Sequence, residues 1–397
     1  MIKKFLDLGI QPLANNYLKK KDLIKKKKEL LYHLEVGFNS KTKLISILNT
    51  VPSKKMFDDN YPYRSSMSKT MLLSFKKLSK HLKLFYKPNS ILEIGSNDGS
   101  LIKNFNKKKA ICVEPCKNVA KITKRLGYKT FTDFWDINLA RKIKASNKKK
   151  IDLIYSANTL SHISNLDSVF KSICHVMAEK GILIIEDPSL LECIKNISYD
   201  QFYNEHIYVF SLIAINEAIK KYKLEVFDIE KLETHGGSLR YYIKRISNKK
   251  FKINNRVKKQ FSEELKFKLN KYSTFVNFRK KVEKSKKNLK KIFYDIKKKR
   301  KKIIGYGATA KATTVLNFCN INDETIDYFL DTTPDKVKKF MPGTHIFIKP
   351  YNKKSLNFAD YVFLGAWNFK QEIFKKEKKF LKKGGKFITH IPKPHII

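Results

Sequence analysis

Short apolar runs alternate with longer amphipathic stretches between about residues 73 and 245. This alternation predicts strands and helices in turn, and it is typical of a parallel sheet with helices on both faces. The apolar runs that we expect to be strands of this sheet are 91–94, 110–113, 129–131, 151–156, 181–186 and 224–232. A strand, a glycine turn and a helix at 303–311 then begin a second, Rossmann-like α/β unit. Its further strands are expected at 326–330, 361–364 and 386–388.

Two other segments differ from these α/β units. The N-terminal segment carries a strand and turn at 5–15 and a hairpin pattern at 30–36 and 44–48. Residues 247–299 are helical in pattern and very rich in lysine, so we expect one or two solvated helices there. The chain therefore divides into a small N-terminal domain (1–72), an α/β domain (73–246), and a helical linker with a second α/β domain (247–397).

One glycine turn carries the first functional signal. The strand pattern at 91–94 breaks into E-x-G-x-x-D-G between Glu93 and Gly99, where a side chain at Gly95 or Gly99 would keep the backbone from touching a ligand. This is not the G-x-G-x-x-G of dinucleotide-binding folds, and no basic residue is placed to hold a pyrophosphate. Glu114 ends the next strand and suits the two hydroxyls of a ribose. The pattern therefore favours S-adenosylmethionine (SAM), which carries adenosine and a sulfonium amino acid but no phosphate.

The charge of the chain is extreme, with 84 Lys+Arg against 36 Asp+Glu and a formal net charge of +48. Such a charge usually suggests nucleic acid or an anionic surface. The lysines are spread along the whole chain, however, and no nucleic-acid-binding motif accompanies them. We attribute them to an AT-rich coding bias and expect no nucleic-acid partner, although a basic protein still attracts a substrate that carries phosphates.

The five cysteines form no Cys-x-x-Cys pair and lie mostly in apolar runs, which predicts reduced core residues of a cytoplasmic protein. Polar residues interrupt any apolar core of a signal peptide near the N-terminus. No apolar run approaches the length that spans a membrane, so we expect no membrane partner.

Candidate acid–base residues follow the predicted strands of the first α/β domain. They are His162, Tyr203, Glu205, His206 and His235. Loops that follow parallel strands converge at the ligand edge of such a sheet. An imidazole accepts a proton near neutral pH, and a neighbouring carboxylate can orient it. A metal site built from His162, Glu205 and His206 is the alternative, but no H-x-x-x-H pair supports it.

At these motifs the chain resembles the SAM-dependent C-methyltransferases that act on nucleotide-linked 4-keto deoxysugars, such as the sugar C-3 methyltransferases of antibiotic pathways. The resemblance covers nearly the whole chain. The matching motifs are L-D-L-G-x-Q-P-L-A-N at 6–15, E-I-G-S-N-D-G-S-L at 93–101, V-E-P at 113–115, N-x-x-x-H at 158–162, Y-x-E-H at 203–206, H-G-G-S-L-R at 235–240, G-Y-G-A-x-A-K at 305–311, D-T-T-P-D-K at 331–336, M-P-G-T-H at 341–345 and A-W-N-F at 366–369.

The resemblance implies a zinc-binding N-terminal domain, a SAM-binding domain, and a Rossmann-like C-terminal domain that helps to hold the nucleotide sugar. It also implies that His206 is the catalytic base, that Tyr203 and Glu205 support it, and that His162 lines the pocket. The residues expected at SAM are Glu93, Gly95, Ser96, Asn97, Asp98, Gly99, Glu114 and Asn158. The residues expected at the sugar nucleotide are Tyr63, His235, Gly236, Arg240, Tyr306, Gly307, Lys311, Trp367 and Asn368. The oligomeric state stays open.

The chain departs from the family pattern in two places. Members usually carry two Cys-x-x-Cys pairs near the N-terminus, but this chain begins after the place of the first pair, and residues 37–43 hold no cysteine at the second. We therefore predict no structural metal and a less stable N-terminal domain. Asn204 replaces a frequent histidine, which we expect to change the polarity of the pocket or the choice of substrate.

The mechanism that these residues suggest begins with removal of a proton from the carbon beside a ketone by His206. Tyr203 or His162 then stabilises the enolate oxygen, and the enolate carbon receives the methyl group of SAM. Three alternatives remain at this stage: a SAM-dependent methyltransferase for a hydroxyl, an amine or a non-sugar ketone; an NAD-dependent oxidoreductase that uses the turn at 305–310; and a basic scaffold that binds nucleic acid.

Overall fold

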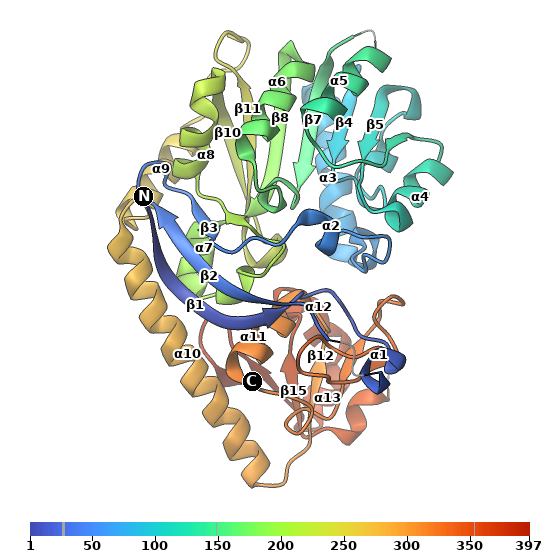
Figure 1. The fold of residues 1–397 in the computed structure, drawn as a ribbon, viewed down its shortest axis with the longest axis vertical. Coiled ribbons are helices and arrows are strands. Elements are labelled where there is room, and N and C mark those ends of the chain that lie inside the picture. The colour runs from blue at the N-terminus through green and yellow to red at the C-terminus, as the bar shows by residue number, and fades with distance from the viewer. Residues whose placement is uncertain (26–27, 148, 353) are drawn as a thin grey trace.

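The computed structural model describes residues 1–25, 28–147, 149–352 and 354–397. Within them the chain forms three sheets (Figure 1), and the largest occupies the upper part of that view. Its strand order is β10-β11-β8-β7-β4-β5-β6. Strands β8, β7, β4, β5 and β6 run parallel to one another, and β11 pairs antiparallel with both β8 and β10. The bounds are β4 (Ile91–Ile94), β5 (Ala110–Val113), β6 (Lys129–Phe131), β7 (Ile151–Ala157), β8 (Met177–Pro188), β10 (Leu224–Leu232) and β11 (Ser238–Arg245).

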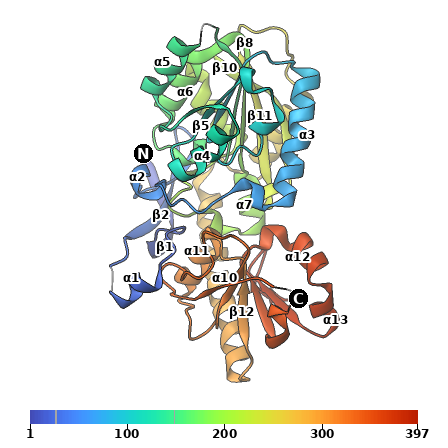
Figure 2. The same cartoon turned by 90° about the vertical axis from the view of Figure 1, so that its right-hand side faces the viewer.

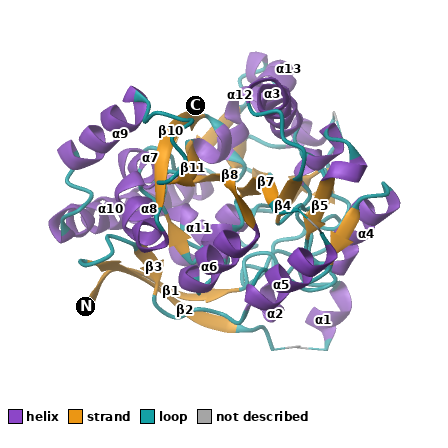
Figure 3. Cartoon of the chain, turned by 90° about the horizontal axis from the view of Figure 1, so that it is seen from above, coloured by secondary structure: helices purple, strands orange, loops and turns teal. Residues whose placement is uncertain are grey.

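Helices cover both faces of this sheet, as its apolar strands require. Figure 3 shows α5 and α6 on one side of the row of strands and α3 on the other. Helix α3 starts where the Ser68 hydroxyl accepts a hydrogen bond from the Met71 amide, and its apolar stripe of Met71, Phe75, Leu78 and Leu82 packs on the sheet. The helices of this region are α3 (Lys69–Phe85), α4 (Lys117–Arg125), α5 (Ile137–Ser146), α6 (Leu166–Val176), α7 (Leu190–Asn196) and α8 (Leu212–Ile219). The predicted sheet with helices on both faces is confirmed, but it is mixed and not wholly parallel, because β11 runs antiparallel to both of its neighbours.

The N-terminal sheet is built largely from one long hairpin. Strands β1 (Ile2–Pro12) and β2 (Leu31–Asn39) pair antiparallel, followed by β3 (Ile45–Ile47), with the short helices α1 (Lys20–Ile24) and α2 (Ser53–Met56) nearby. Strand β1 begins three residues before the strand and turn predicted at 5–15 and ends at Pro12. The sheet is completed by β9 (Tyr208–Val209), which comes from the loop that carries the Y-x-E-H motif. This pairing was not predicted, because two apolar residues give too short a signal. The proposed domain boundaries remain a prediction.

The third sheet lies at the C-terminal end, in the lower part of Figure 1. Its order is β14-β13-β12-β15-β16-β17, and all neighbours except the last pair are parallel. The bounds are β12 (Ile303–Tyr306), β13 (Phe329–Asp331), β14 (Ile348–Pro350), β15 (Tyr361–Leu364), β16 (Lys386–Thr389), β17 (His395–Ile396), α11 (Ala310–Cys319), α12 (Lys370–Lys376) and α13 (Lys378–Lys382).

Two helices, α9 (Asn255–Lys266) and α10 (Tyr272–Lys298), connect the two α/β parts. The prediction of solvated helices at 247–299 is correct for the lysines but misses the other face. In α10, Phe275, Phe278, Val282 and Leu289 are buried in a core that also holds Phe5 of β1 and Val315 of α11. Figure 2 shows how α10 runs down behind the C-terminal sheet. The N-terminal hairpin, the linker and the C-terminal part therefore share one hydrophobic core.

Candidate active site

Two cavities meet at the interface of the two α/β parts. The first has a volume of about 340 Å³ and lies over the carboxyl ends of β4, β5 and β7. The second has a volume of about 290 Å³ and lies between the Y-x-E-H loop, the N-terminal segment and the C-terminal sheet. Both are lined by Tyr61, Tyr63, Asn158 and His162. A group bound in one cavity is therefore adjacent to a group bound in the other.

The glycine turn after β4 forms one wall of the first cavity. Gly95 has φ +73°, a left-handed conformation that favours glycine, and a Cβ there would lie 2.0 Å from Oγ1 of Thr159. The amides of Gly95 and Ser96 both donate to the carbonyl of Val113, which fixes the loop against β5. The backbone at this turn is therefore held close to the cavity.

Two carboxyl groups line the first cavity. Glu93 and Glu114 are both buried and both line it, and burial raises the pKa of each. Each Glu114 oxygen accepts one backbone amide, from Asn97 and from Cys116, at 2.9 Å, which leaves further lone pairs for hydroxyl donors. Oε2 of Glu93 and Oγ of Ser96 are buried without a hydrogen-bond partner in the described part of the chain. Unpaired polar atoms beside an acidic wall fit the ribose and the cationic sulfonium amino acid of SAM.

Two predicted cofactor residues act on the loop instead of lining the cavity. Asp98 accepts hydrogen bonds from the Ser66 amide at 3.0 Å and the Ser100 hydroxyl at 2.6 Å. A Cβ at Gly99 would lie 2.9 Å from the methyl group of Thr123, so this glycine serves packing. Asn97 lines the cavity, and its side chain also accepts from the Ser65 amide. The loop is thus tied to the segment that carries Tyr63.

The Tyr203–His206 pair is the main acid–base group of the second cavity. Nδ1 of His206 lies 2.8 Å from the carbonyl oxygen of Gln201, and Nε2 lies 2.7 Å from the Tyr203 hydroxyl. A carbonyl only accepts, so Nδ1 carries the proton of the neutral ring and Nε2 accepts the proton of Tyr203. Burial, helped by His162 and Lys311, holds the pKa of His206 well below its usual value. The ring is therefore neutral at pH 7, as a base must be.

Glu205 does not orient the base, contrary to the expected arrangement. Its carboxylate accepts from Nδ2 of Asn15 at 2.7 Å and from the Tyr61 hydroxyl at 3.0 Å, and no hydrogen bond to His206 is present among the described residues. Burial raises the pKa of Glu205 to about 7. The segment forms a turn in which the His206 amide donates to the Tyr203 carbonyl at 2.8 Å, and the side chains of Glu205 and His206 have different hydrogen-bond partners although the two residues are adjacent in sequence.

His162 connects the two cavities. Its ring stacks on that of His206, with 5.2 Å between centroids, and on Phe57 on the other side at 5.4 Å. Nε2 is buried without a partner among the described residues, and burial lowers the pKa of His162 to about 3. Asn204 lines a neighbouring polar cavity on the other side of Glu205 and is not among the lining residues of the second cavity, and its effect on polarity or substrate choice remains a prediction.

Six of the predicted substrate residues line the second cavity: Tyr63, His235, Tyr306, Gly307, Lys311 and Asn368. The other three are not among its lining residues. A Cβ at Gly236 would lie 2.1 Å from the ring of Trp367, whose Nε1 donates to the fully buried carboxylate of Asp200 at 2.6 Å. Gly236 and Trp367 therefore join the two α/β parts beside the cavity.

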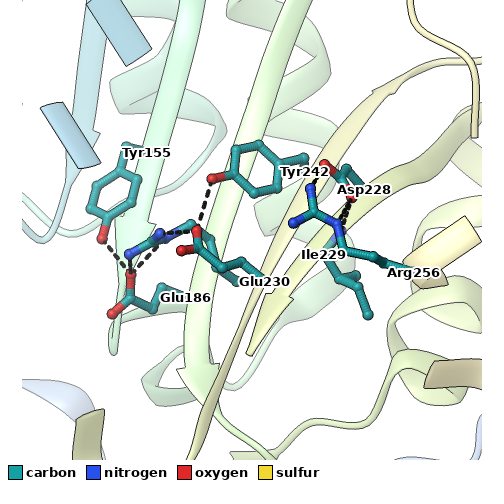
Figure 4. Close-up of polar contacts among 8 residues, drawn as sticks. Tyr155, Glu186, Asp228, Ile229, Glu230, Tyr242 and Arg256 are labelled. Carbon is teal, nitrogen blue, oxygen red and sulfur yellow. Dashed lines mark hydrogen bonds and ion pairs between the residues drawn. The ribbon is translucent and has the colours of Figure 1, made fainter. Parts of the chain in front are cut away.

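Arg240 is the third residue outside the cavity. Its Nη2 lies 2.8 Å from Oε2 of Glu186, and its Nη1 pairs with Glu230. Figure 4 labels both carboxylates and also Tyr155, which donates to Glu186 at 3.0 Å. The side chain of Arg240 is 3% exposed, so β11 turns it into the domain and away from the substrate side. The alternation of side chains along a strand predicts the face of the sheet on which Arg240 lies only if the register of the strand is known.

Several lining residues were not predicted. They are Asn15, Arg64, Thr332, Thr333, Lys336, Tyr351, Glu372 and Lys376. Asn15 and Lys336 lie inside motifs of the resemblance, which was a usable signal. Tyr351 and Lys376 come from regions without a motif, and Lys376 lies 3.3 Å from the centroid of the Tyr351 ring.

One further cluster bears on the prediction of no metal. In the N-terminal hairpin, Asp7, His33 and Glu35 place possible metal-ligand atoms within 4.8 Å of one another. This is the group of possible metal ligands found among the described residues. The ammonium of Lys4 already lies 2.5 Å from Glu35 and 3.6 Å from Asp7. A cation is therefore supplied by the chain itself, and the absence of a metal remains a prediction.

Comparison with known proteins gives two adjacent matches. A family model described as a methyltransferase domain matches residues 63–229, and one described as the C-terminal domain of C-methyltransferases matches residues 233–392. This chain is a SAM-dependent C-methyltransferase. The C-methyltransferase NovU of Streptomyces niveus is 26% identical over 398 residues, which cover 99% of this chain and 93% of that protein. The oxidoreductase and the nucleic-acid scaffold are thereby set aside.

Solved structures also match the enzyme in part. A SAM-dependent methyltransferase from Clostridium acetobutylicum is 18% identical with a TM-score of 0.34, and the match covers 43% of this chain and 92% of that one. A magnesium protoporphyrin IX methyltransferase from Synechocystis, solved with bound SAM, is 11% identical with a TM-score of 0.32, over 44% and 79% of the two chains. In the described residues of the C-methyltransferase, no helix has the length and apolar character to cross a membrane.

Proposed function

We propose that the enzyme methylates the carbon beside the ketone of a nucleotide-linked deoxysugar. The observation that carries this proposal is the junction of the two cavities at Asn158 and His162, with the Tyr203–His206 pair on the substrate side. A base next to the junction is what carbon methylation requires, because the carbon must lose a proton before it can act as a nucleophile.

The charges of the two cavities support a phosphorylated acceptor. Glu93 and Glu114 line the first cavity, where SAM places its cationic sulfonium. The second cavity is lined by four cationic side chains, those of Arg64, Lys311, Lys336 and Lys376. It also holds three acidic residues, so it can meet both phosphates and sugar hydroxyls. Cations from the N-terminal and C-terminal parts thus surround one substrate.

The proton has a defined path from the acceptor. The Tyr203 oxygen accepts the proton of the substrate carbon while its own proton moves along the 2.7 Å hydrogen bond to Nε2 of His206. The imidazolium that results is stabilised by the Gln201 carbonyl at Nδ1. SAM, when bound in the first cavity, supplies an electrophilic methyl group. The Gly95 turn, Glu114 and Asn158 would hold it, and His162 would separate its site from the base.

The test is hydrogen exchange and methyl transfer on a panel of nucleotide-linked 4-keto deoxysugars in D₂O. The wild type should incorporate deuterium beside the ketone and transfer a methyl group when SAM is added. His206→Asn should lose both activities and keep its SAM affinity. His175→Asn, on α6 and outside both cavities, is the matched control. If the wild type methylates an alcohol or amine and exchanges no keto sugar, the proposed acceptor is wrong.

A further inference from the structure

Lys311 is a buried lysine that lines the second cavity without a partner of its own. It is the second residue of α11, after the Thr309 cap, and it is 8% exposed. No hydrogen bond or ion pair of its ammonium is present within the described residues. Lys336 of the same cavity, by contrast, donates to the Ala308 carbonyl at 2.9 Å, and Lys376 lies over the ring of Tyr351. A buried cation that the chain leaves unpaired is expensive unless a ligand completes it.

Burial also acts on the charge of this lysine. It lowers the pKa of Lys311, and the negative charge of Asp200 opposes that effect. An anionic oxygen bound at the ammonium would act in the same direction as Asp200, because an opposite charge favours the protonated form. The charge of Lys311 is therefore best supported when an anion occupies the cavity.

Two phenols of this cavity, those of Tyr203 and Tyr61, already donate hydrogen bonds within the protein. Tyr203 gives its single proton to Nε2 of His206, and Tyr61 gives its proton to Glu205. Neither can donate to a new oxyanion without breaking that bond. The hydrogen bonds therefore argue against Tyr203 as the donor to the enolate oxygen. Tyr63 and His162 remain as neutral donors in the lining of this cavity, and a neutral donor stabilises an anion less than a cation does.

Proton transfer to His206 also requires that a cation stabilise the enolate that forms. The α-hydrogen of a ketone is a far weaker acid than an imidazolium, and the buried His206 is a weaker base than a histidine in water. Proton transfer to it becomes accessible only if the enolate is strongly stabilised. Lys311, His206 and His235 line the same cavity, so the ammonium of Lys311 lies in the cavity where the proton is transferred.

We propose that the ammonium of Lys311 binds the ketone oxygen of the acceptor and stabilises the enolate. This rests on the proposed function, since it requires an acceptor with a ketone. In the step, the carbon–hydrogen bond breaks, its electron pair forms the carbon–carbon double bond, and the carbonyl π pair moves onto oxygen. The proton goes to the Tyr203–His206 pair. Lys311 keeps all its protons and supplies charge only.

The competing role for Lys311 is to hold a phosphate of the substrate. The two roles differ in what they control, because a phosphate contact acts equally on the ground state and the transition state, whereas an enolate contact acts on the rate at saturation. Exchange without methyl donor isolates the enolisation step. We therefore compare the exchange rate at saturating keto sugar in D₂O with the dissociation constant of the same sugar nucleotide.

Lys311→Met should lower the saturated exchange rate by about 10²–10³-fold, the loss typical for one oxyanion donor. Its dissociation constant for the sugar nucleotide should stay within about threefold of the wild-type value. Lys244→Met is the matched control, since Lys244 is also buried but is paired with Glu225 on β10, outside both cavities. It should keep the wild-type exchange rate. Unchanged saturated exchange with a dissociation constant raised more than tenfold would assign Lys311 to phosphate binding and overturn the proposal.

Two further measurements keep the outcome clear if the methionine variant folds poorly. Lys311→Ala, checked for SAM affinity, should regain exchange when ethylammonium is added, and absence of rescue in a variant that binds both ligands would contradict the proposal. His206→Asn tests whether Lys311 is itself the base: retained exchange in that variant would refute its purely electrostatic role. If the wild type exchanges no keto sugar, the proposed function fails first, and that result is distinct from unimpaired exchange in Lys311→Met.

Discussion

The glycine turn after β4 gives the sharpest test of the cofactor site. Gly95→Ala places a Cβ 2.0, 2.6 and 2.8 Å from three side-chain atoms of Thr159, at a residue with φ +73°. The left-handed backbone costs about 1–2 kcal/mol for a residue with a Cβ. Overpacking against Thr159 adds about 1–3 kcal/mol. We therefore expect Gly95→Ala to lose about 2–5 kcal/mol of folding stability.

Gly384→Ala is the matched control for this substitution. Gly384 has φ +83°, and nothing lies within 4 Å of a Cβ built there, so its alanine variant carries the backbone strain without the collision. The difference between the two variants measures the steric contribution alone. A second-site change, Thr159→Gly, removes the colliding atoms and should restore part of the loss in the Gly95→Ala background.

The assays are urea unfolding and calorimetric titration with SAM. Thr159 and Asn158 both line the first cavity, so relief of the collision moves its wall, and the SAM dissociation constant of Gly95→Ala should rise at least about tenfold. Gly384→Ala should bind SAM as the wild type does. Equal stability loss and equal SAM affinity in the two variants would refute the idea that this glycine is required by close approach to Thr159.

Three other predictions concern the buried polar groups. Trp367→Phe keeps an aromatic side chain, although a smaller one, but removes the donor to the fully buried Asp200, and urea unfolding should show a loss of about 1–3 kcal/mol. Arg240→Met leaves the buried carboxylate of Glu186 without its cation, so the free energy of unfolding should fall by about 3–5 kcal/mol while the KM for the sugar nucleotide stays unchanged. A raised KM at wild-type stability would instead show that Arg240 belongs to the substrate site. Glu205 keeps its proton in the folded state up to about pH 7 but loses it near pH 4.5 in the unfolded state. As pH rises through this window, the free energy of unfolding of the wild type should therefore fall by about 3 kcal/mol relative to that of Glu205→Gln. Parallel plots of stability against pH for the two proteins would contradict this.

Local pattern was sufficient for most elements that build the cofactor side. The predicted strands at 91–94, 110–113 and 224–232 coincide with β4, β5 and β10, because a buried strand between turn residues is encoded by adjacent residues. The E-x-G-x-x-D-G turn carries Glu93 and Gly95, and Glu114 directly follows β5, so local sequence was enough to predict that these residues lie at one edge of the sheet. A short-range signal is enough where the chain itself connects strand to loop.

The substrate side depended on contacts between segments distant in sequence. Glu205 was expected beside His206, yet Asn15 and Tyr61 bind it from 190 and 144 residues away. The position of Arg240 likewise followed from the register of β11 against β8, which no spacing within the motif specifies.

The sequence by itself determined the class of fold, the glycine turn and the presence of a tyrosine, a carboxylate and histidines on loops after strands. Only the tertiary structure decided which of them touch. The carbonyl of Gln201 sets the tautomer of His206, and the packing of α11 brings Lys311 of the C-terminal part into the same cavity. Hydrogen bonds have a direction and a short range, so residue types alone cannot specify them, and only the packing of the distant segments does.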